Sequence, residues 1–174
     1  IDENKYSKLI EDENVDAIIF TFRHHTSSKN NPQMYGWVKT DLKNNAIEVS
    51  VKIPISTNPY EDHAIVGTFW FKKVEYYKIG LQNLLKKKIT VNNEYYIDSL
   101  MGELIKMGLR VKVFEVKNYI CWGTPDDYKT FNYWQSFFHK VQWHPYSLHN
   151  DFTINKEKLD ILDKKYKKFE QENN

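Results

Sequence analysis

The stretch Val15-Asp16-Ala17-Ile18-Ile19-Phe20-Thr21-Phe22 constrains the fold more than any other part of the sequence. It is a β-rich apolar run, which is typical of a strand buried at the centre of a sheet. Residues 2–13 precede it and carry Tyr6, Leu9 and Ile10 at the spacings of three and four that favour a helix. We therefore expect the chain to begin with a helix followed by a central strand.

The rest of the chain alternates between strand and helix patterns. We predict a polar, exposed connection over 23–33, a hairpin of strands over 35–40 and 46–53, a strand over 64–71, helices over 74–87 and 97–107, strands over 109–116 and 119–122, and helices over 125–141 and 155–171. This order predicts an α/β fold with a mixed sheet and flanking helices, because the hairpin interrupts an even βαβ repeat.

Composition excludes several classes of protein. The 174 residues carry 25 basic and 23 acidic side chains, and this balance argues against a nucleic-acid or membrane-surface binder. One cysteine excludes an internal disulfide framework and a multi-cysteine zinc site. The apolar runs are far shorter than the roughly 20 residues that span a bilayer. No secretory leader is visible, and we expect a cytoplasmic protein.

Most common catalytic patterns are missing from the sequence. The six glycines are too widely spaced to build a glycine-rich phosphate loop, and the six histidines match no metal-ligand spacing. The segment 119–127 is more informative, since a strand there meets a glycine turn and a capped helix. Asp126 and Asp127 either complement the dipole of that helix, or one of them reaches a metal ion.

Five short segments between residues 16 and 140 form an ordered set. They are Tyr35-Gly36-Trp37-Val38 with Asp41, Val51-Lys52-Ile53-Pro54, Ala64–Phe71, Asn93–Asp98 and Trp122–Tyr128. In this order they resemble the Tyr-Gly-Val-Val, Glu-Lys-Pro, glycine-containing core strand, Gly-Glu-x-x-x-Thr/Asp and Gly-Thr-Pro-Glu-Asp-Leu segments in the C-terminal half of the nucleotidyltransferases that activate phosphorylated sugars and related phospho-compounds. Each segment alone is a weak signal, and the order makes the set specific.

The resemblance implies a reaction and a set of acceptor-binding residues. In such enzymes the acceptor phosphate attacks the α-phosphate of a nucleoside triphosphate and pyrophosphate leaves, aided by Mg²⁺ and basic side chains. By resemblance Lys52 holds the acceptor phosphate, and Glu94 accepts hydrogen bonds from the polar groups of the acceptor. Tyr35, Gly36 and Gly67 line the acceptor pocket. The structural alternatives are a solvated lysine, an acid at a helix start, and residues that only begin or pack a strand.

Two positions depart from the family pattern. Val51 stands where the Glu of Glu-Lys-Pro is expected, and Cys121 stands at the place of the second metal-binding aspartate. The resemblance therefore implies that Mg²⁺ is bound differently, through Asp126 or Asp98, or that the metal chemistry of the lineage has changed.

Other family features have no counterpart in the chain. These are the N-terminal glycine-rich loop with its Arg and Lys, the base-recognition strand and the first metal-binding aspartate; the chain itself begins at Ile1. The resemblance implies that residues 1–141 are the C-terminal part of a Rossmann-like nucleotidyltransferase domain of about 250 residues. Residues 142–174 would be a C-terminal loop and charged helix. We assign no catalytic residue in this half, and we expect the chain alone to be inactive.

The resemblance also names partners, and a second interpretation stays open. The wording of residues 31–36 and 119–127 is closest to capsule-associated, cytidylyltransferase-like members, which favours CTP and a small phosphorylated acceptor. The alternative is a non-catalytic binding or assembly module that keeps the sheet. Such a module would use an aromatic surface made of Trp134, Phe137, Phe138, Trp143 and Tyr146. The structural alternative is that these side chains pack in a core. A homo-oligomer remains an option.

Overall fold

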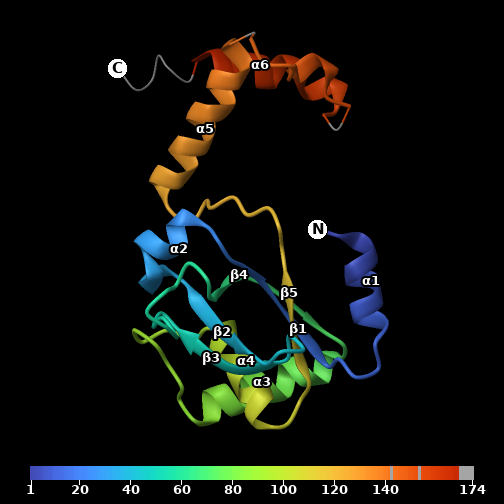
Figure 1. Ribbon diagram of the computed structural model, residues 1–174, viewed down its shortest axis with the longest axis vertical. Coiled ribbons are helices and arrows are strands. Elements are labelled where there is room, and N and C mark those ends of the chain that lie inside the picture. The colour runs from blue at the N-terminus through green and yellow to red at the C-terminus, as the bar shows by residue number, and fades with distance from the viewer. Residues whose placement is uncertain (142, 153, 169–174) are drawn as a thin grey trace. The chain divides into compact units, whose positions relative to one another are not determined.

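The computed structural model describes residues 1–141, 143–152 and 154–168 (Figure 1). The chain forms two compact units, one spanning Ile1–Tyr119 and the other beginning at Ile120. The resemblance implies a different boundary, at residue 141, which marks where the domain of the family would end. That boundary stays a prediction.

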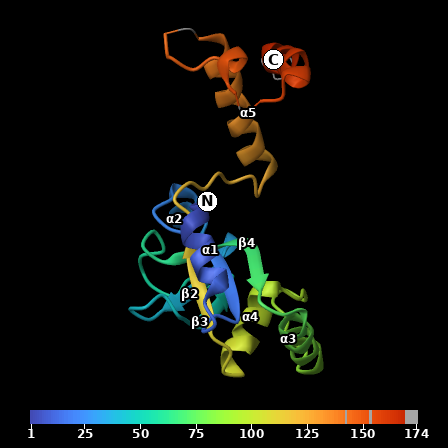
Figure 2. The same cartoon turned by 90° about the vertical axis from the view of Figure 1, so that its right-hand side faces the viewer.

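A five-stranded sheet forms the first unit. Its strands are β1 (Ala17–Phe22), β2 (Gly36–Thr40), β3 (Ala46–Val51), β4 (His63–Phe71) and β5 (Val111–Glu115). They lie side by side in the order β3-β2-β4-β1-β5; Figure 1 labels all five strands, and Figure 2 shows the same sheet turned by 90°. β1 and β5 run parallel, whereas the pairs β1–β4, β2–β3 and β2–β4 are antiparallel. The predicted α/β fold with a mixed sheet and flanking helices is therefore confirmed.

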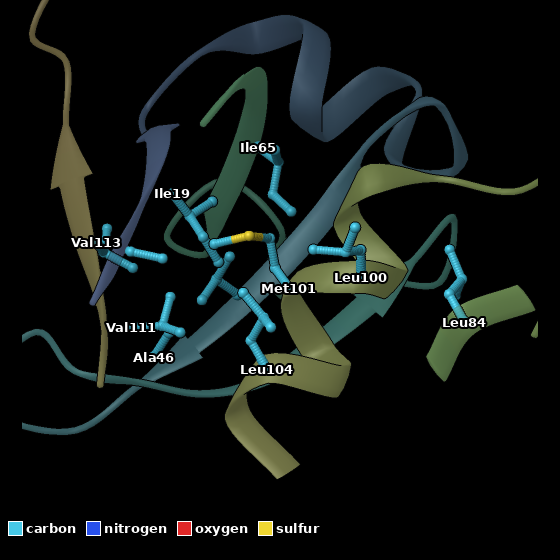
Figure 3. Packing of buried hydrophobic residues seen from close by; sticks show 11 residues of the cluster. Ile19, Ala46, Ile65, Leu84, Leu100, Met101, Leu104, Val111 and Val113 are labelled. Carbon is cyan, nitrogen blue, oxygen red and sulfur yellow. The ribbon is translucent and has the colours of Figure 1, made fainter. Parts of the chain in front are cut away.

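Both faces of the central strand β1 are covered. Ala17 and Ile19 belong to a buried cluster with α3 (Val74–Lys86) and α4 (Ile97–Lys106), while Ile18 and Phe20 pack in another cluster that includes α1 (Glu3–Glu11). Successive side chains of a strand point to opposite faces, so an entirely apolar run places buried side chains in both clusters. In Figure 3, Met101 of α4 points toward Ile19.

Two carboxylates next to this core form ion pairs with basic side chains. Glu103 on α4 is buried and accepts hydrogen bonds from Lys87 at 2.6 Å and Lys106 at 2.8 Å. The Arg110 guanidinium, just before β5, donates two 2.9 Å hydrogen bonds to Asp16, just before β1. Each of these pairs satisfies a carboxylate that would otherwise be costly to bury.

Two local predictions in this part of the chain are wrong. The connection over 23–33 holds a short helix α2 (Thr26–Asn30) and a 3₁₀ turn η1 (Pro32–Met34). The imidazole of His25 caps α2 by accepting a 3.2 Å hydrogen bond from the Ser27 N–H, and composition alone does not reveal this cap. The strand expected over 119–122 does not form; Tyr119 contributes its ring instead, stacked on Phe22 at 3.8 Å.

The regular secondary structure described in the second unit is helical, with irregular segments between the helices. It contains α5 (Pro125–Lys140), α6 (Leu159–Lys168) and two 3₁₀ turns, η2 (Leu148–Asn150) and η3 (Lys156–Lys158). The predicted cap is confirmed, since the Thr124 hydroxyl and the Asp127 carboxylate form a capping box at the start of α5. Helix α6 follows η3, and the predicted helix end at residue 171 lies outside the described residues. Among the helices that are described, none is long and apolar enough to cross a membrane.

Candidate functional site

The β2–β3 hairpin brings two of the predicted site residues close together. Gly36 pairs with Val51 across the hairpin, and the next backbone N–H, that of Lys52, donates a 3.0 Å hydrogen bond to the Tyr35 carbonyl. Lys52 has a φ of 63°, a left-handed conformation that costs a residue with a side chain about 1 kcal/mol. The two segments that resemble family motifs thus meet at the end of this hairpin.

The Lys52 ammonium group is held by two neighbours. Its Nζ donates a 2.8 Å hydrogen bond to the Met34 carbonyl and lies 5.5 Å from the centre of the Tyr96 ring. An ammonium over an aromatic face is stabilised by the negative potential of the ring. The side chain is therefore fixed in place while its charge stays partly in contact with solvent.

Tyr96 links Lys52 to Glu94. Its hydroxyl donates a hydrogen bond to the Glu94 carboxylate, and this bond raises the pKa of Tyr96. Glu94 is fixed on the backbone side as well, because its N–H and C=O both bond to Val91 at 3.0 Å. Glu94 is itself exposed, so its carboxylate is accessible from solvent.

Asp98, in the first turn of α4, lies against Gly36. A β-carbon added to Gly36 would overlap Asp98 Oδ2 and would lie 3.0 Å from Ile65 Cδ1. Burial raises the pKa of Asp98, while a hydrogen bond from its own backbone N–H and the charge of Lys52 act in the opposite direction. Gly36 is therefore needed to make room for a desolvated carboxyl group. We refer to Gly36, Lys52, Glu94, Tyr96 and Asp98 as the Lys52 cluster.

Three other predicted residues lie outside this cluster. The Tyr35 side chain is buried, where its ring contacts Phe22 and its hydroxyl donates a 2.8 Å hydrogen bond to Ser27. Gly67 lies where β4 bulges against β1, with a φ of 95° that favours glycine. Asp126 belongs to the second unit, where its side chain is 92% exposed and lies 3.7 Å from Lys129.

A second polar group lies where β1 and β5 end. His63 is buried and its Nδ1 shares a 2.9 Å hydrogen bond with the Thr21 hydroxyl, while Arg23 forms a two-pronged ion pair with Glu115 at 2.7 and 3.1 Å. Burial lowers the pKa of His63, and the Arg23 charge acts in the same direction. Because the polar side chains of this group bond to one another, we interpret their role as structural: they hold neighbouring strands together.

The implied Mg²⁺ has no complete set of ligands in the described part of the chain. Within residues 1–141, 143–152 and 154–168, no three His, Cys, Asp or Glu side chains are grouped so that they could hold a metal ion. Asp98 is directed at Gly36, and Cys121 donates a 3.4 Å hydrogen bond to Asp127. The magnesium expectation therefore remains a prediction.

The fold of this chain is similar to that of a solved pyrophosphorylase structure. No family model and no curated protein matches the sequence. Among solved structures, a nucleoside-diphosphate-sugar pyrophosphorylase from Vibrio cholerae RC9 matches with a TM-score of 0.56 and 21% identity, over 75% of this chain and 48% of that one. A CMP:2-keto-3-deoxy-manno-octonic acid synthetase complexed with CTP matches with a TM-score of 0.46 and 15% identity, over 74% of this chain and 52% of that one. The chain thus spans about half the length of each structure.

Tyr96 is the member of the Lys52 cluster that sequence reasoning missed. It lies inside the segment Asn93–Asp98 that carries the family resemblance, but no role follows from that resemblance. The only sequence feature that could have indicated a role is the position of Tyr96 two residues after Glu94. At this spacing the tyrosine hydroxyl reaches the Glu94 carboxylate and donates a hydrogen bond to it.

Proposed function

We propose that the chain is the acceptor-binding half of a nucleotidyltransferase. The whole enzyme would transfer a nucleoside monophosphate from a nucleoside triphosphate to a phosphorylated sugar or small phospho-compound and release pyrophosphate. The main supporting observation is the Lys52 cluster itself, in which three separate segments bring a cation and two carboxyl groups together around a glycine.

The chemistry of the cluster suits an acceptor phosphate. An ammonium has three donors, and the hydrogen bond from Lys52 to the Met34 carbonyl uses one of them, which leaves two for a phosphate oxygen. Hydrogen bonds of this kind are charge-assisted and stronger than neutral ones. Glu94 would accept hydrogen bonds from a hydroxyl or amine of the acceptor, because Tyr96 occupies only part of the accepting capacity of its carboxylate.

Several finer statements belong to the same proposal. Because no glycine-rich loop with Arg and Lys occurs in the sequence, we expect no turnover of nucleotide by this chain alone. Three further parts of the proposal rest only on the resemblance of the motifs: CTP as the nucleotide, a capsule-associated pathway, and Mg²⁺. Tyr35, Gly67 and Asp126 keep their predicted roles only as part of this proposal. The whole enzyme would act in the cytoplasm, and the homo-oligomer stays an open prediction.

One observation favours the alternative of a binding or assembly module. Several aromatic side chains of the second unit are exposed, with Trp143 at 76%, Trp134 at 48% and Tyr146 at 45%. The structural alternative of core packing is therefore wrong for these three residues. A module that lost its chemistry would keep such a surface for a partner.

Calorimetric titration of the 174-residue chain tests the proposal. Inorganic phosphate, glucose 1-phosphate and glycerol 3-phosphate serve as probes, and Lys52→Met removes the charge while it keeps the length of the side chain. We expect Lys52→Met to weaken binding by roughly ten- to a hundredfold, which corresponds to one or two charge-assisted hydrogen bonds. Lys43→Met is the matched control, because Lys43 is exposed in the hairpin turn. If all three proteins bind the probes equally, Lys52 does not hold the acceptor.

A further inference from the structure

We propose that the exposed aromatic face of α5 is the interface of a homodimer, in which it packs against the same face of a second, antiparallel copy of this chain. This surface belongs to the second unit and is separate from the Lys52 cluster. The proposal does not depend on the transfer reaction, and it gives the homo-oligomer that the sequence left open a specific surface.

One row of α5 side chains has the spacing of a helix-packing surface. Its members follow one another at intervals of four and three residues: Asp126, Thr130, Tyr133, Phe137 and Lys140. This spacing places them along one side of the helix, and it is the spacing by which two helices pack against each other. The row is aromatic at its centre and carries an acidic and a basic side chain at its two ends.

The side of α5 that faces α6 is a different one, and its contacts are polar. The Ser136 hydroxyl donates a hydrogen bond to the Tyr166 carbonyl, and the His139 imidazole lies 2.7 Å from the Asp163 carboxylate. A helix normally buries its apolar side and exposes its polar side. In the described part of the second unit, α6 therefore covers polar side chains of α5 and leaves aromatic ones exposed.

The exposed aromatic surface has the area of the apolar part of an interface. Tyr133, Trp134, Phe138 and Trp143 are 47%, 48%, 41% and 76% exposed, and the Phe137 ring contacts all four at centre-to-centre distances between 5.5 and 6.5 Å. At roughly 150–250 Å² for each aromatic side chain, the four leave roughly 300–500 Å² uncovered. A stable interface buries about 800 Å² per partner, of which a little over half is apolar. The patch therefore suits one dimer interface.

The charges at the two ends of the row favour a second copy over a different protein. Asp126 lies seven residues before Tyr133, and Lys140 lies seven residues after it. A two-fold axis at Tyr133 pairs α5 with an antiparallel copy, and it brings Asp126 of each copy close to Lys140 of the other. The Asp126 side chain is 92% exposed, so a second copy can reach it. Opposite charges that meet across an interface fix its register.

Sedimentation of the 174-residue chain over a range of concentrations tests the proposal. We expect a monomer–dimer equilibrium with a Kd in the micromolar range, since the aromatic patch meets the needs of one interface of standard size. Trp134→Ser should raise this Kd about tenfold or more, because buried tryptophans dominate binding energies and each dimer loses two of them. Phe152→Ser is the matched control, because Phe152 is 97% exposed in the same unit but does not lie on α5, and it should leave the Kd unchanged.

Charge exchange distinguishes the antiparallel pair from other associations. Asp126→Lys places like charges against each other at both ends of the interface, and it should raise the Kd roughly fivefold or more at low salt. The double variant Asp126→Lys/Lys140→Asp restores opposite charges and should recover most of the affinity.

Three results would overturn the proposal. The first is a native chain that stays monomeric throughout the micromolar range, which would mean that another occupant, such as the other half of the enzyme, covers the face. The second is an equal loss of affinity in Trp134→Ser and Phe152→Ser, and the third is a double variant that recovers no affinity. If circular dichroism shows that Trp134→Ser unfolds, the charge-exchange series decides the question.

Discussion

The packing of Asp98 against Gly36 gives a prediction whose size can be worked out from the structure. In Gly36→Ala the new methyl group overlaps Asp98 Oδ2 and approaches Ile65 Cδ1 to 3.0 Å. The backbone itself imposes no penalty, because Gly36 is not among the residues with positive φ. Overpacking of a filled interior costs about 1–3 kcal/mol, and the strand preference of alanine over glycine returns roughly 0.5–1 kcal/mol. We expect the first unit to lose about 1–2 kcal/mol.

A double-mutant cycle assigns this cost to Asp98. In the background Asp98→Ala the overlap with the carboxyl group is gone, and only the flexible end of Ile65 remains close. Gly36→Ala should then cost less than about 1 kcal/mol, and the coupling between the two positions should be about 1 kcal/mol. Hydrogen exchange of the β2 and β3 amides is the appropriate assay, since it reports on the first unit alone. If Gly36→Ala costs the same with and without the carboxyl group, the two residues are not packed as described.

Three further variants test the electrostatics and the capping. Burial raises the pKa of Asp98 in the folded state above its unfolded value of about 4. The contribution of Asp98 to stability is therefore present at low pH and is lost as the pH rises through the folded pKa. Asp98→Asn should abolish this dependence, which unfolding of the first unit at a series of pH values would measure. Glu103 has the opposite sign, because Lys106 and Lys87 lower its pKa: its contribution is present at neutral pH and is lost as the pH falls through the folded pKa. Glu103→Gln should remove it at a cost of about 1 kcal/mol, a modest value because both lysines are more than half exposed; an unchanged acid limb would argue against the ion pairs. Thr124→Ala should destabilise α5 by roughly 1 kcal/mol through loss of its capping box, measured by hydrogen exchange in the first turn, and unaltered exchange would contradict the cap.

The fold was predictable where hydrophobic pattern and burial agree. The run at residues 15–22 gave the correct central strand because β1 is buried along its whole length, with helices on both faces. The pattern failed where local side-chain bonds decide the structure. Helix α2 depends on the cap by His25, and Tyr119 stacks its ring on Phe22 instead of pairing in a strand.

The candidate site was predictable only through the resemblance. Gly36, Lys52, Glu94 and Asp98 look ordinary one by one, and no spacing rule brings them together. Their proximity arises from the β2–β3 hairpin and from the start of α4, which are tertiary features.

The most direct test of the central claim is mapping of the acceptor site by NMR on the 174-residue chain. Glucose 1-phosphate and glycerol 3-phosphate would be titrated into ¹⁵N-labelled protein, and the shifts of the backbone amides would be followed. We predict that the largest shifts fall at Gly36, Lys52, Glu94 and Asp98, and that Lys52→Met abolishes them. Shifts that avoid these four residues, or that persist in Lys52→Met, would contradict the claim that this half of the enzyme binds the acceptor.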